Sequence, residues 1–247
     1  MAFQTVFKRY EIKYMTTLEQ KAKVLDAMKP YMKLDKYGRT TIRNIYYDTD
    51  TYLLIRRSIE KPTYKEKLRI RSYVRAESDS TVFVELKKKY KHVVYKRRIS
   101  LPNNEAMGWL SGERHTNKHT QISNEIDYFM DYYGTLHPTV FLSYEREAFY
   151  TNDGSDFRVT FDDNILCRQE DLSLESEVYG TPILPEGMVL MEIKCSGGIP
   201  LWMTQVLSKE HIYKTSFSKY GTAYRTLIFP QTHKINEHNM LEVAINA

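Results

Sequence analysis

Charged and apolar residues alternate along residues 63–71, which read Thr-Tyr-Lys-Glu-Lys-Leu-Arg-Ile-Arg. Because the side chains of a β-strand alternate between its two faces, this stretch predicts a strand with cations on one face. The four cations are Lys65, Lys67, Arg69 and Arg71. Cations in a row repel one another unless an anion lies opposite them. Two interpretations stay open for this face: a solvent-exposed edge whose lysines discourage aggregation, or a surface that binds an anion.

The same alternation predicts strands along most of the chain. We expect them at residues 3–14, 40–48, 63–71, 81–90, 93–101, 139–150, 157–163 and 189–196. Short turns join the third, fourth and fifth of these strands, so antiparallel pairing is the most economical topology.

Helical spacing of apolar residues occurs between the strands. It predicts helices over residues 18–32, 122–133 and 201–213, and shorter helical turns over 51–57 and 104–110. Thr16 or Thr17 can cap the first helix, Pro30 should end it, and Gly134 should end the second. Residues 169–186 are acidic and rich in turn residues, which is typical of a surface loop. The pattern therefore predicts an α+β fold.

Charged residues recur on one face of nearly every expected strand. These candidates are Arg9, Glu11, Lys13, Arg43, Lys67, Arg69, Arg71, Glu85, Lys87, Lys96, Arg98, Arg146, Arg158, Glu192 and Lys194. If about eight strands close into a barrel, these side chains line its lumen and the apolar faces turn outward to covering helices. A dry lumen of this composition would be unstable if it were empty, but it suits a polyanion with a divalent cation.

We therefore expect a closed antiparallel β-barrel tunnel with flanking helices. Residues 1–230 should form this tunnel as a single domain, and residues 231–247 should form a C-terminal tail, because they lack apolar periodicity. No internal repeat or low-complexity run interrupts the chain.

Composition narrows the class of protein. The chain of 247 residues has a formal net charge of +5, which fits an anionic partner without being diagnostic of nucleic acid. Cys167 and Cys195 lie in apolar segments and predict reduced thiols in a cytoplasmic protein. No run approaches the roughly 18 apolar residues of a membrane span, so we expect membrane recruitment only through a partner.

Glu192 is the strongest candidate for a metal ligand, because it is a carboxylate inside the otherwise apolar stretch Val-Leu-Met-Glu-Ile-Lys-Cys. The alternative is an internal salt bridge to Lys194 or to an arginine of a neighbouring strand. His115 and His119 are four residues apart, but they lie in a polar segment without further ligand spacing. A glycine-rich phosphate loop is absent from the sequence, so side chains would have to bind phosphate.

Nine segments, taken in order, resemble a known family. They are residues 9–14 (RYEIKY), 45–48 (IYYD), 67–73 (KLRIRSY), 83–87 (FVELK), 96–98 (KRR), 144–149 (YEREAF), 157–162 (FRVTFD), 190–194 (LMEIK) and 216–220 (SFSKY). Together they resemble the VTC domain, the polyphosphate polymerase module of the vacuolar transporter chaperone family, within the triphosphate tunnel metalloenzyme superfamily. The resemblance runs from about residue 5 to residue 228.

The resemblance implies an antiparallel tunnel that binds ATP or polyphosphate with Mn²⁺ or Mg²⁺. It implies that Glu192 binds the metal and that Lys219, which alternation does not select, binds phosphate. The expected catalytic residues are Arg69, Arg71, Arg146 and Arg158. The expected phosphate- or nucleotide-binding residues are Lys13, Lys67, Lys87, Lys96, Arg98 and Lys219.

The expected activity is transfer of the γ-phosphoryl group of ATP to a growing polyphosphate chain. A tripolyphosphatase or nucleoside triphosphatase could use the same tunnel with water as acceptor, and Glu11 or Glu85 could then activate the water. A non-catalytic polyphosphate or nucleotide sensor is a third candidate. RNA binding is disfavoured, because the cations follow strand alternation and are not interleaved with an exposed aromatic platform.

Two departures from the family pattern shape this expectation. Related tunnel enzymes begin with Glu-x-Glu-x-Lys, whereas Arg9 stands at the first glutamate of this sequence, which favours the VTC branch. The sequence also contains neither the phosphate-sensing domain nor the membrane helices of the eukaryotic subunits. We therefore expect a free-standing, bacterial version.

Overall fold

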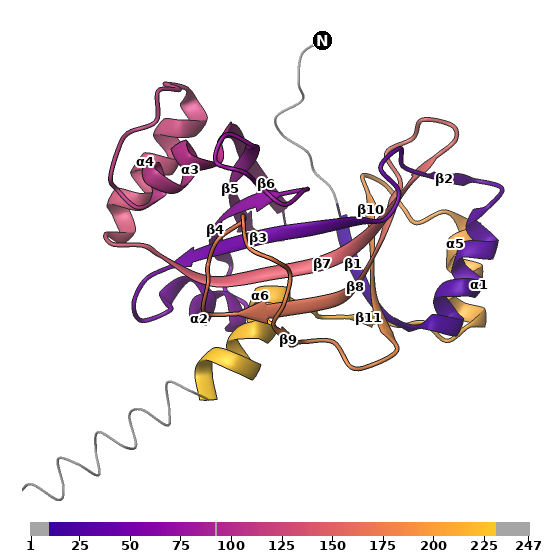
Figure 1. Cartoon of the computed structure of the whole chain (residues 1–247). Helices are drawn as coiled ribbons and strands as arrows, with labels where there is room; N and C mark the ends of the chain where they lie inside the picture. The colour runs from indigo at the N-terminus through magenta and orange to yellow at the C-terminus, as the bar shows by residue number, and fades with distance from the viewer. Residues whose placement is uncertain (1–9, 92, 231–247) are drawn as a thin grey trace, which may run out of the picture.

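The computed structural model describes residues 10–91 and 93–230 (Figure 1). Their strands form one sheet of eleven strands, and every strand pairing in it is antiparallel. The strands are β1 (Tyr10–Thr17), β2 (Met32–Leu34), β3 (Thr40–Asp48), β4 (Tyr64–Ser72), β5 (Thr81–Tyr90), β6 (Val93–Pro102), β7 (His137–Thr151), β8 (Arg158–Arg168), β9 (Thr181–Pro182), β10 (Met188–Cys195) and β11 (Lys214–Thr215). The α+β class and the antiparallel pairing predicted from the sequence are confirmed.

Six α-helices accompany these strands in the described residues. They are α1 (Leu18–Met28), α2 (Leu53–Ile59), α3 (Asn103–Leu110), α4 (Gln121–Tyr133), α5 (Leu201–Lys209) and α6 (Lys219–Ala223), and a π-helical turn (Tyr224–Ile228) continues α6. Thr17 caps α1 by accepting a hydrogen bond from the amide of Gln20, and Gly134 follows the last residue of α4.

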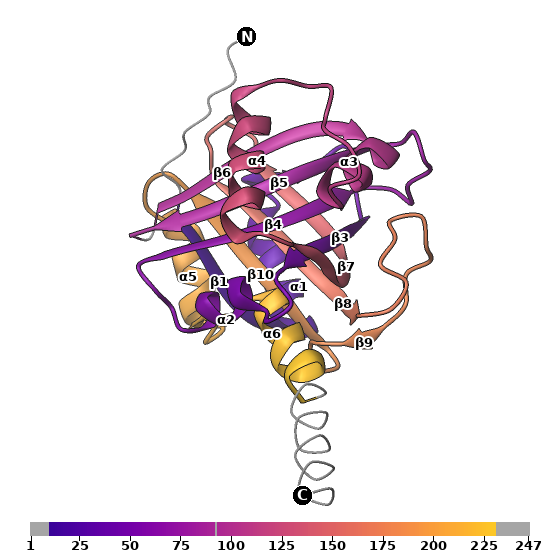
Figure 2. The ribbon, with the colours of Figure 1, turned by 90° about the vertical axis from the view of Figure 1, so that its left-hand side faces the viewer.

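The hydrogen-bonded order of the strands is β11-β1-β10-β8-β7-β3-β4-β5-β6, with β2 beside β7 and β9 beside β8. Within the described residues, β11 and β6 end this path and do not pair with each other, so a closed barrel is not shown. The sheet is nevertheless strongly curved (Figure 2). In a flat sheet, β1 and β5 would lie about 29 Å apart. Instead, Lys87 Nζ of β5 lies 2.9 Å from the Glu11 carboxylate of β1, across the concave inner face.

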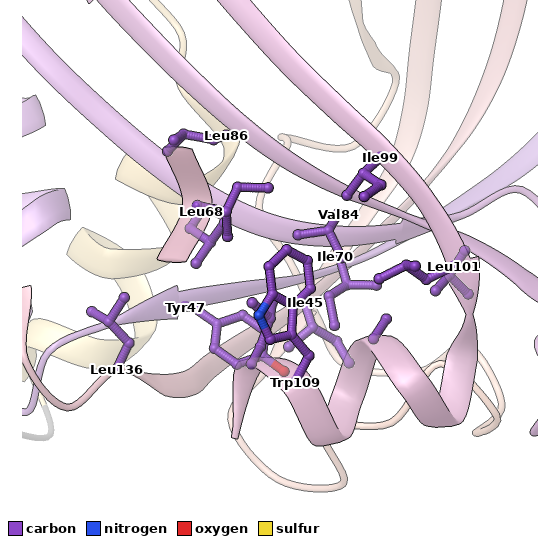
Figure 3. Close-up of a cluster of buried hydrophobic side chains, with 14 of the residues drawn as sticks. Ile45, Tyr47, Leu68, Ile70, Val84, Leu86, Ile99, Leu101, Trp109 and Leu136 are labelled. Atoms are coloured by element: carbon purple, nitrogen blue, oxygen red, sulfur yellow. The ribbon is translucent and has the colours of Figure 1, made fainter. Parts of the chain in front are cut away.

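The outer face of the sheet is apolar and is covered by helices. Over β3 to β6, α3 and α4 bury a cluster in which Trp109 packs against Ile45, Ile70 and Leu101 (Figure 3). The indole N–H of Trp109 donates to Asp127 of α4 at 2.7 Å, which satisfies its polar atom. At the other end of the sheet, α1 and α5 lie side by side and cover the outer faces of β1, β8 and β10 (Figure 1).

The segment that contains α6 packs against one end of the inner face. Tyr220 of α6 stacks on Tyr46 of β3, with ring centroids 4.7 Å apart. The Tyr220 hydroxyl donates to Asp48 at 2.9 Å, and Asp48 also accepts from the amides of Leu54 and Ile55 in the first turn of α2. These contacts fix α2 and α6 together under the end of the sheet, and they position Lys219 toward the concave face.

Several element boundaries differ from the predictions. The first helix ends at Met28 because the chain turns and Met32–Leu34 pairs with β7. The strand predicted at 157–163 continues to Arg168, past a register shift in its pairing with β7. Arg43, predicted for the lumen, lies on the outer face, because it pairs with Ser72 while its neighbour Asn44 pairs with the inner residue Arg71.

Some predictions lie outside the described residues. These are the strand before Tyr10, which includes Arg9, and the tail 231–247. No helix among residues 10–91 and 93–230 has the length and apolar character needed to cross a membrane.

Candidate functional site

Three adjacent strands arrange their inner side chains in cross-strand rows. The pairing of β4 with β5 and of β5 with β6 fixes these rows. In order along the sheet they are Arg71, Phe83 and Ser100; Arg69, Glu85 and Arg98; Lys67, Lys87 and Lys96; and Lys65, Lys89 and Val94. We call the second row the arginine row and the last two the lysine rows. Strand alternation thus gives these strands one strongly charged inner face and one largely apolar outer face.

Glu85 is the acceptor at the centre of the arginine row. Its side chain is 1% exposed, and its carboxylate accepts from Arg69 Nε at 2.8 Å, Arg98 Nε at 2.7 Å and Lys96 Nζ at 2.5 Å. Burial alone would raise the pKa of Glu85, but Arg69, Arg71 and the other neighbouring cations hold it well below its usual range. Glu85 is therefore ionised and neutralises only part of the surrounding positive charge.

Asp162 of β8 forms a second acceptor on the inner face. Arg146 of β7 donates to both of its oxygens, from Nε at 2.6 Å and from a terminal nitrogen at 2.7 Å. Lys219 of α6 donates to the same carboxylate at 2.5 Å. Burial would raise the pKa of Asp162, but Lys219 and Arg146 lower it to about 2. The structure thus brings Lys219, which strand alternation did not select, to the same site as Arg146.

Glu192 of β10 lies between two lysines. Its side chain is 9% exposed, Lys194 Nζ lies 3.0 Å from it and Lys13 Nζ lies 4.0 Å from it. Burial would raise the pKa of Glu192, but Lys194 and Lys13 hold it well below its usual range, so it is a charged oxygen donor. Burial lowers the pKa of Lys13 to about 8, although Glu192 opposes this shift.

A divalent ion fits Glu192 only in company with other ligands. Within the described residues, no group of three or more His, Cys, Asp or Glu side chains is placed to hold a metal ion. Mg²⁺ and similar hard cations commonly bind one or two carboxylates and complete their shell with water and phosphate oxygens. The donor set at Glu192 suits a metal that arrives with a phosphate.

Lys67 is a half-buried cation among cations. Its Nζ donates to the Ser218 hydroxyl at 3.0 Å. Burial, followed by the charges of Lys13, Lys65, Lys87 and Arg69, holds the pKa of Lys67 well below its usual range. A half-buried ammonium group among other cations is destabilising unless an anion binds beside it.

Arg158 of β8 also faces the inner side, in line with Thr160 and Asp162. Its guanidinium carbon lies 4.6 Å from the ring centroid of Tyr150. Among the described residues, the buried Nε of Arg158 and the buried hydroxyl of Thr160 have no hydrogen-bond partner. These two polar groups suit a ligand with several acceptor oxygens.

Sequence reasoning assigned no role to three polar residues that the site contains. Tyr144, 2% exposed, accepts from Arg71 at 2.9 Å, and the Lys219 ammonium lies 4.4 Å from its ring centroid. Tyr46 accepts from Arg69 at 2.8 Å, and Asn44 accepts from Arg71 at 2.9 Å. Burial would raise the pKa of Tyr144, but nearby cations lower it to about 8. Alternation in β3 and β7 was the signal that could have found all three.

The predicted site residues therefore share one surface. Ten of them lie on the inner faces of β1, β4, β5, β6, β7, β8 and β10, and Lys219 lies at the start of α6. The surface presents arginine guanidinium groups and lysine ammonium groups from many directions, with a few ionised carboxylates as their internal partners. Such a surface can bind a linear anion rich in oxygen acceptors. The role of each residue stays a prediction.

The comparisons with known proteins agree with this architecture. The sequence profile described as the VTC domain matches residues 8–228. A Bacillus halodurans protein assigned provisionally as an adenylate cyclase is similar in structure, with a TM-score of 0.56 and 15% identity over 91% of this chain and 100% of that one. At that identity the likeness shows the fold alone.

A Hippeastrum protein assigned provisionally as an adenylyl cyclase, and described as having a dominant triphosphatase activity, has a TM-score of 0.49 and 16% identity over 88% of this chain and 95% of that one. No curated protein matches the sequence.

Proposed function

This chain belongs to the VTC domain family, and we propose that it is a polyphosphate polymerase that transfers the γ-phosphoryl group of ATP to a growing polyphosphate chain. The observation that carries the proposal is the convergence of cations on one concave face, of which Arg69, Arg146 and Lys219 are largely buried. Arg69, Arg98 and Lys96 surround Glu85, and Arg146 and Lys219 surround Asp162. Two carboxylates are too few to neutralise these groups, whereas the oxygens of a phosphate chain would serve all of them.

In this proposal the four predicted catalytic arginines act by neutralising charge. They approach from three strands: Arg69 and Arg71 from β4, Arg146 from β7 and Arg158 from β8. A terminal oxygen of the chain attacks the γ-phosphorus of ATP, the bond from that phosphorus to the bridging oxygen breaks, and ADP leaves. The attacking group is already an anion, so the step needs no strong general base. Positioning and electrostatic stabilisation supply most of the rate enhancement.

The remaining predicted ligands hold the substrates in place. Lys67 and Lys87 lie side by side on β4 and β5, and Lys13 comes from β1 across the concave side. Lys13 and Lys67 contact the segment just before α6, and Lys87 contacts Glu11 of β1. Glu192, together with phosphate oxygens, would hold Mn²⁺ or Mg²⁺, and the bound metal would neutralise charge on those oxygens. Lys219 and Arg146 would exchange part of their contact with Asp162 for phosphate.

We infer that the concave face works as a tunnel in a single domain of residues 1–230. The contacts that favour this inference cross from one side to the other: Lys87 of β5 with Glu11 of β1, and Lys67 of β4 with the hydroxyl of Ser218, which follows β11. Cytoplasmic location, bacterial origin and membrane recruitment through a partner stay predictions from the sequence.

Hydrolysis is the second candidate, because the same ligands could bind a triphosphate with water as acceptor. It would require a carboxylate able to activate the water. Glu85 is engaged by three cations and Glu11 by Lys87, and the pKa of each is lowered, so both are weak bases. This electrostatic setting favours chain growth over hydrolysis.

The test is an assay of purified protein with ATP and Mn²⁺, with and without a short polyphosphate primer. Products are resolved on gels, and ADP and orthophosphate are measured separately. The proposal predicts ADP release matched by lengthening chains, lost in Arg69→Ala and Glu192→Ala. Arg97→Ala is the control, since Arg97 pairs with Glu125 on the outer face. Orthophosphate without chains would make the protein a hydrolase, and binding without turnover would make it a sensor.

A further inference from the structure

The inner rows of β4, β5 and β6 change in chemistry along the tunnel. The arginine row holds a buried carboxylate, Glu85, bonded to both of its neighbours in the row. The lysine rows contain five lysines and no carboxylate: Lys67, Lys87, Lys96, Lys65 and Lys89. Successive rows are about 7 Å apart, because two residues of a strand separate them. The lysine rows therefore extend about 14 Å beyond the arginine row.

Lys65 and Lys89 form the outermost of these rows, and neither belongs to the predicted site. Lys65 Nζ donates to the carbonyl of Ser58 at the end of α2 at 3.0 Å. Burial, followed by the charges of Lys89, Lys61 and Lys87, lowers the pKa of Lys65. The strongest electrostatic influences on this end of the face are therefore those of other lysines.

Protection of a sheet edge, the usual structural role of such lysines, does not explain them. Lysines protect an exposed sheet edge, but β4 and β5 lie inside the sheet, each with a partner on both sides. Lys88, between Lys87 and Lys89 in sequence, points to the opposite face and lies 3.8 Å from Glu66. On that outer face Lys88 has a carboxylate nearby. On the inner face Lys87 and Lys96 contact Glu11 and Glu85, but the charges that act most strongly on Lys65 in the outermost row are those of other lysines.

We propose that the two lysine rows form a track that holds the phosphate chain beyond the arginine row and leads it out of the tunnel past Lys65 and Lys89. This inference rests on the proposed function and gives the tunnel a direction. The arginine row is the reacting end, and the lysine end is where the product chain leaves.

The difference between the two cations suits these two tasks. Arginine is a planar fork that fixes a phosphate in one geometry, as a reacting group requires. Lysine is a flexible point charge that binds phosphate oxygens in many geometries. A chain that lengthens one unit at a time must slide, and sliding requires several weak, equivalent sites, as in the multi-site binding of ion channels.

The test measures binding without catalysis. Wild type, Lys65→Gln/Lys89→Gln and Lys88→Gln are titrated with tripolyphosphate and with a long polyphosphate at several salt concentrations. Lys88→Gln is the matched control, since it removes the neighbouring charge on the other face of β5. Thermal unfolding checks that each variant folds, and Lys89→Gln alone replaces the double variant if that one does not.

The track predicts that the double variant binds the long chain about tenfold more weakly, with a much smaller loss for tripolyphosphate. The slope of log affinity against log salt should also fall by about 2, or about 1 for Lys89→Gln alone. Lys88→Gln should behave as wild type with both ligands.

Equal losses for both ligands, or no loss for either, would overturn the track. It would also be overturned if single-stranded RNA bound as tightly as polyphosphate through the same two lysines, because the surface would then be a nucleic-acid site. The polymerase assay separates the two proposals. Lysine-dependent binding of long chains in a protein that makes no chains would reject the polymerase and support the track. Chain synthesis with unaltered lengths and binding in the double variant would reject the track alone.

Discussion

The two faces of β4 and β5 are formed by alternate residues of the same strands, yet they have opposite physical roles. Leu68 and Ile70 are fully buried on the outer face, in the cluster that Trp109 covers (Figure 3). Arg69 and Glu85 are largely buried on the inner face, where burial opposes their charges. Apolar burial stabilises the fold, whereas a buried ion pair adds little net stability. The outer face therefore explains why the chain folds, and the inner face requires a functional explanation.

Adjacent residues can separate the two roles, and Arg69 and Leu68 give the largest expected contrast. Arg69→Ala should lower kcat/KM about 10²- to 10³-fold, because it removes a charge that stabilises the transferring phosphoryl group. Leu68→Ala should cost about 2–5 kcal/mol of unfolding free energy while the folded fraction keeps its activity. Steady-state kinetics and denaturant unfolding measure the two effects. Activity losses that merely follow the unfolded fraction in both variants would contradict this division.

Glu85→Gln tests the inner face by removing its carboxylate instead of one of its cations. The substitution removes the charge that Arg69, Arg98 and Lys96 share, so the free protein should lose about 1–3 kcal/mol of stability. Tripolyphosphate should then raise the melting temperature of the variant more than that of wild type, since the ligand supplies the missing negative charge. Thermal melts with and without tripolyphosphate test this. An equal ligand shift in both proteins would mean that Glu85 and phosphate do not share these cations.

A smaller effect, on ligand binding, should distinguish Arg98 from its neighbour Arg97 on β6. Arg98 donates to Glu85 on the inner face, whereas Arg97 donates to Glu125 of α4 on the outer face. Arg98→Ala should weaken tripolyphosphate binding about tenfold, and Arg97→Ala should leave it within about twofold of wild type. Calorimetric titration of the two variants gives the comparison, and equal affinities would show that the faces are not distinct.

The smallest expected effect is on pH dependence. Burial lowers the pKa of Lys13 to about 8 and that of Lys96 to about 7. Between about pH 7 and the usual lysine range, these lysines bind fewer protons in the folded protein than in the unfolded chain. The free protein should therefore become more stable as the pH rises through that window.

Phosphate affinity should change in the opposite sense. An anion prefers the protonated lysine, so tripolyphosphate should bind with proton uptake and several-fold more weakly at pH 9 than at pH 7. Lys13→Arg should reduce this loss, because arginine stays charged. Titration in buffers of different ionisation enthalpy measures the uptake, and an affinity that rises with pH would contradict the assignment.

The local alternation of residues was sufficient to predict a strand and its two faces where the alternation continues along the whole strand. The bounds of β3 and β5 follow the predicted segments, and alternation put Arg69, Glu85 and Lys87 on one face. Arg43 was assigned to the wrong side because it was selected for its charge alone, without regard to its position in the alternation of β3. It shares the outer face with Ile45 and Tyr47.

Other features depend on contacts between distant segments. Lys219 lies on a short helix with no strand period, and it joins the site through Asp162, 57 residues away in the chain. The strands β2, β9 and β11 have two or three residues each and carry no periodic signal. Curvature of the sheet is likewise a property of all its strands together, so no single segment could predict that Glu11 meets Lys87.

The most direct test of the account is a crystal structure with a non-hydrolysable ATP analogue and Mn²⁺. The account predicts the triphosphate on the concave face, with oxygens within hydrogen-bonding distance of Arg69, Arg71, Arg146 and Arg158 and the metal at Glu192. It also predicts that the contacts of Arg69 with Glu85 and of Arg146 with Asp162 loosen as phosphate replaces them. An analogue bound away from this face, with both contacts intact, would contradict the central claim that these buried charges are a phosphate site.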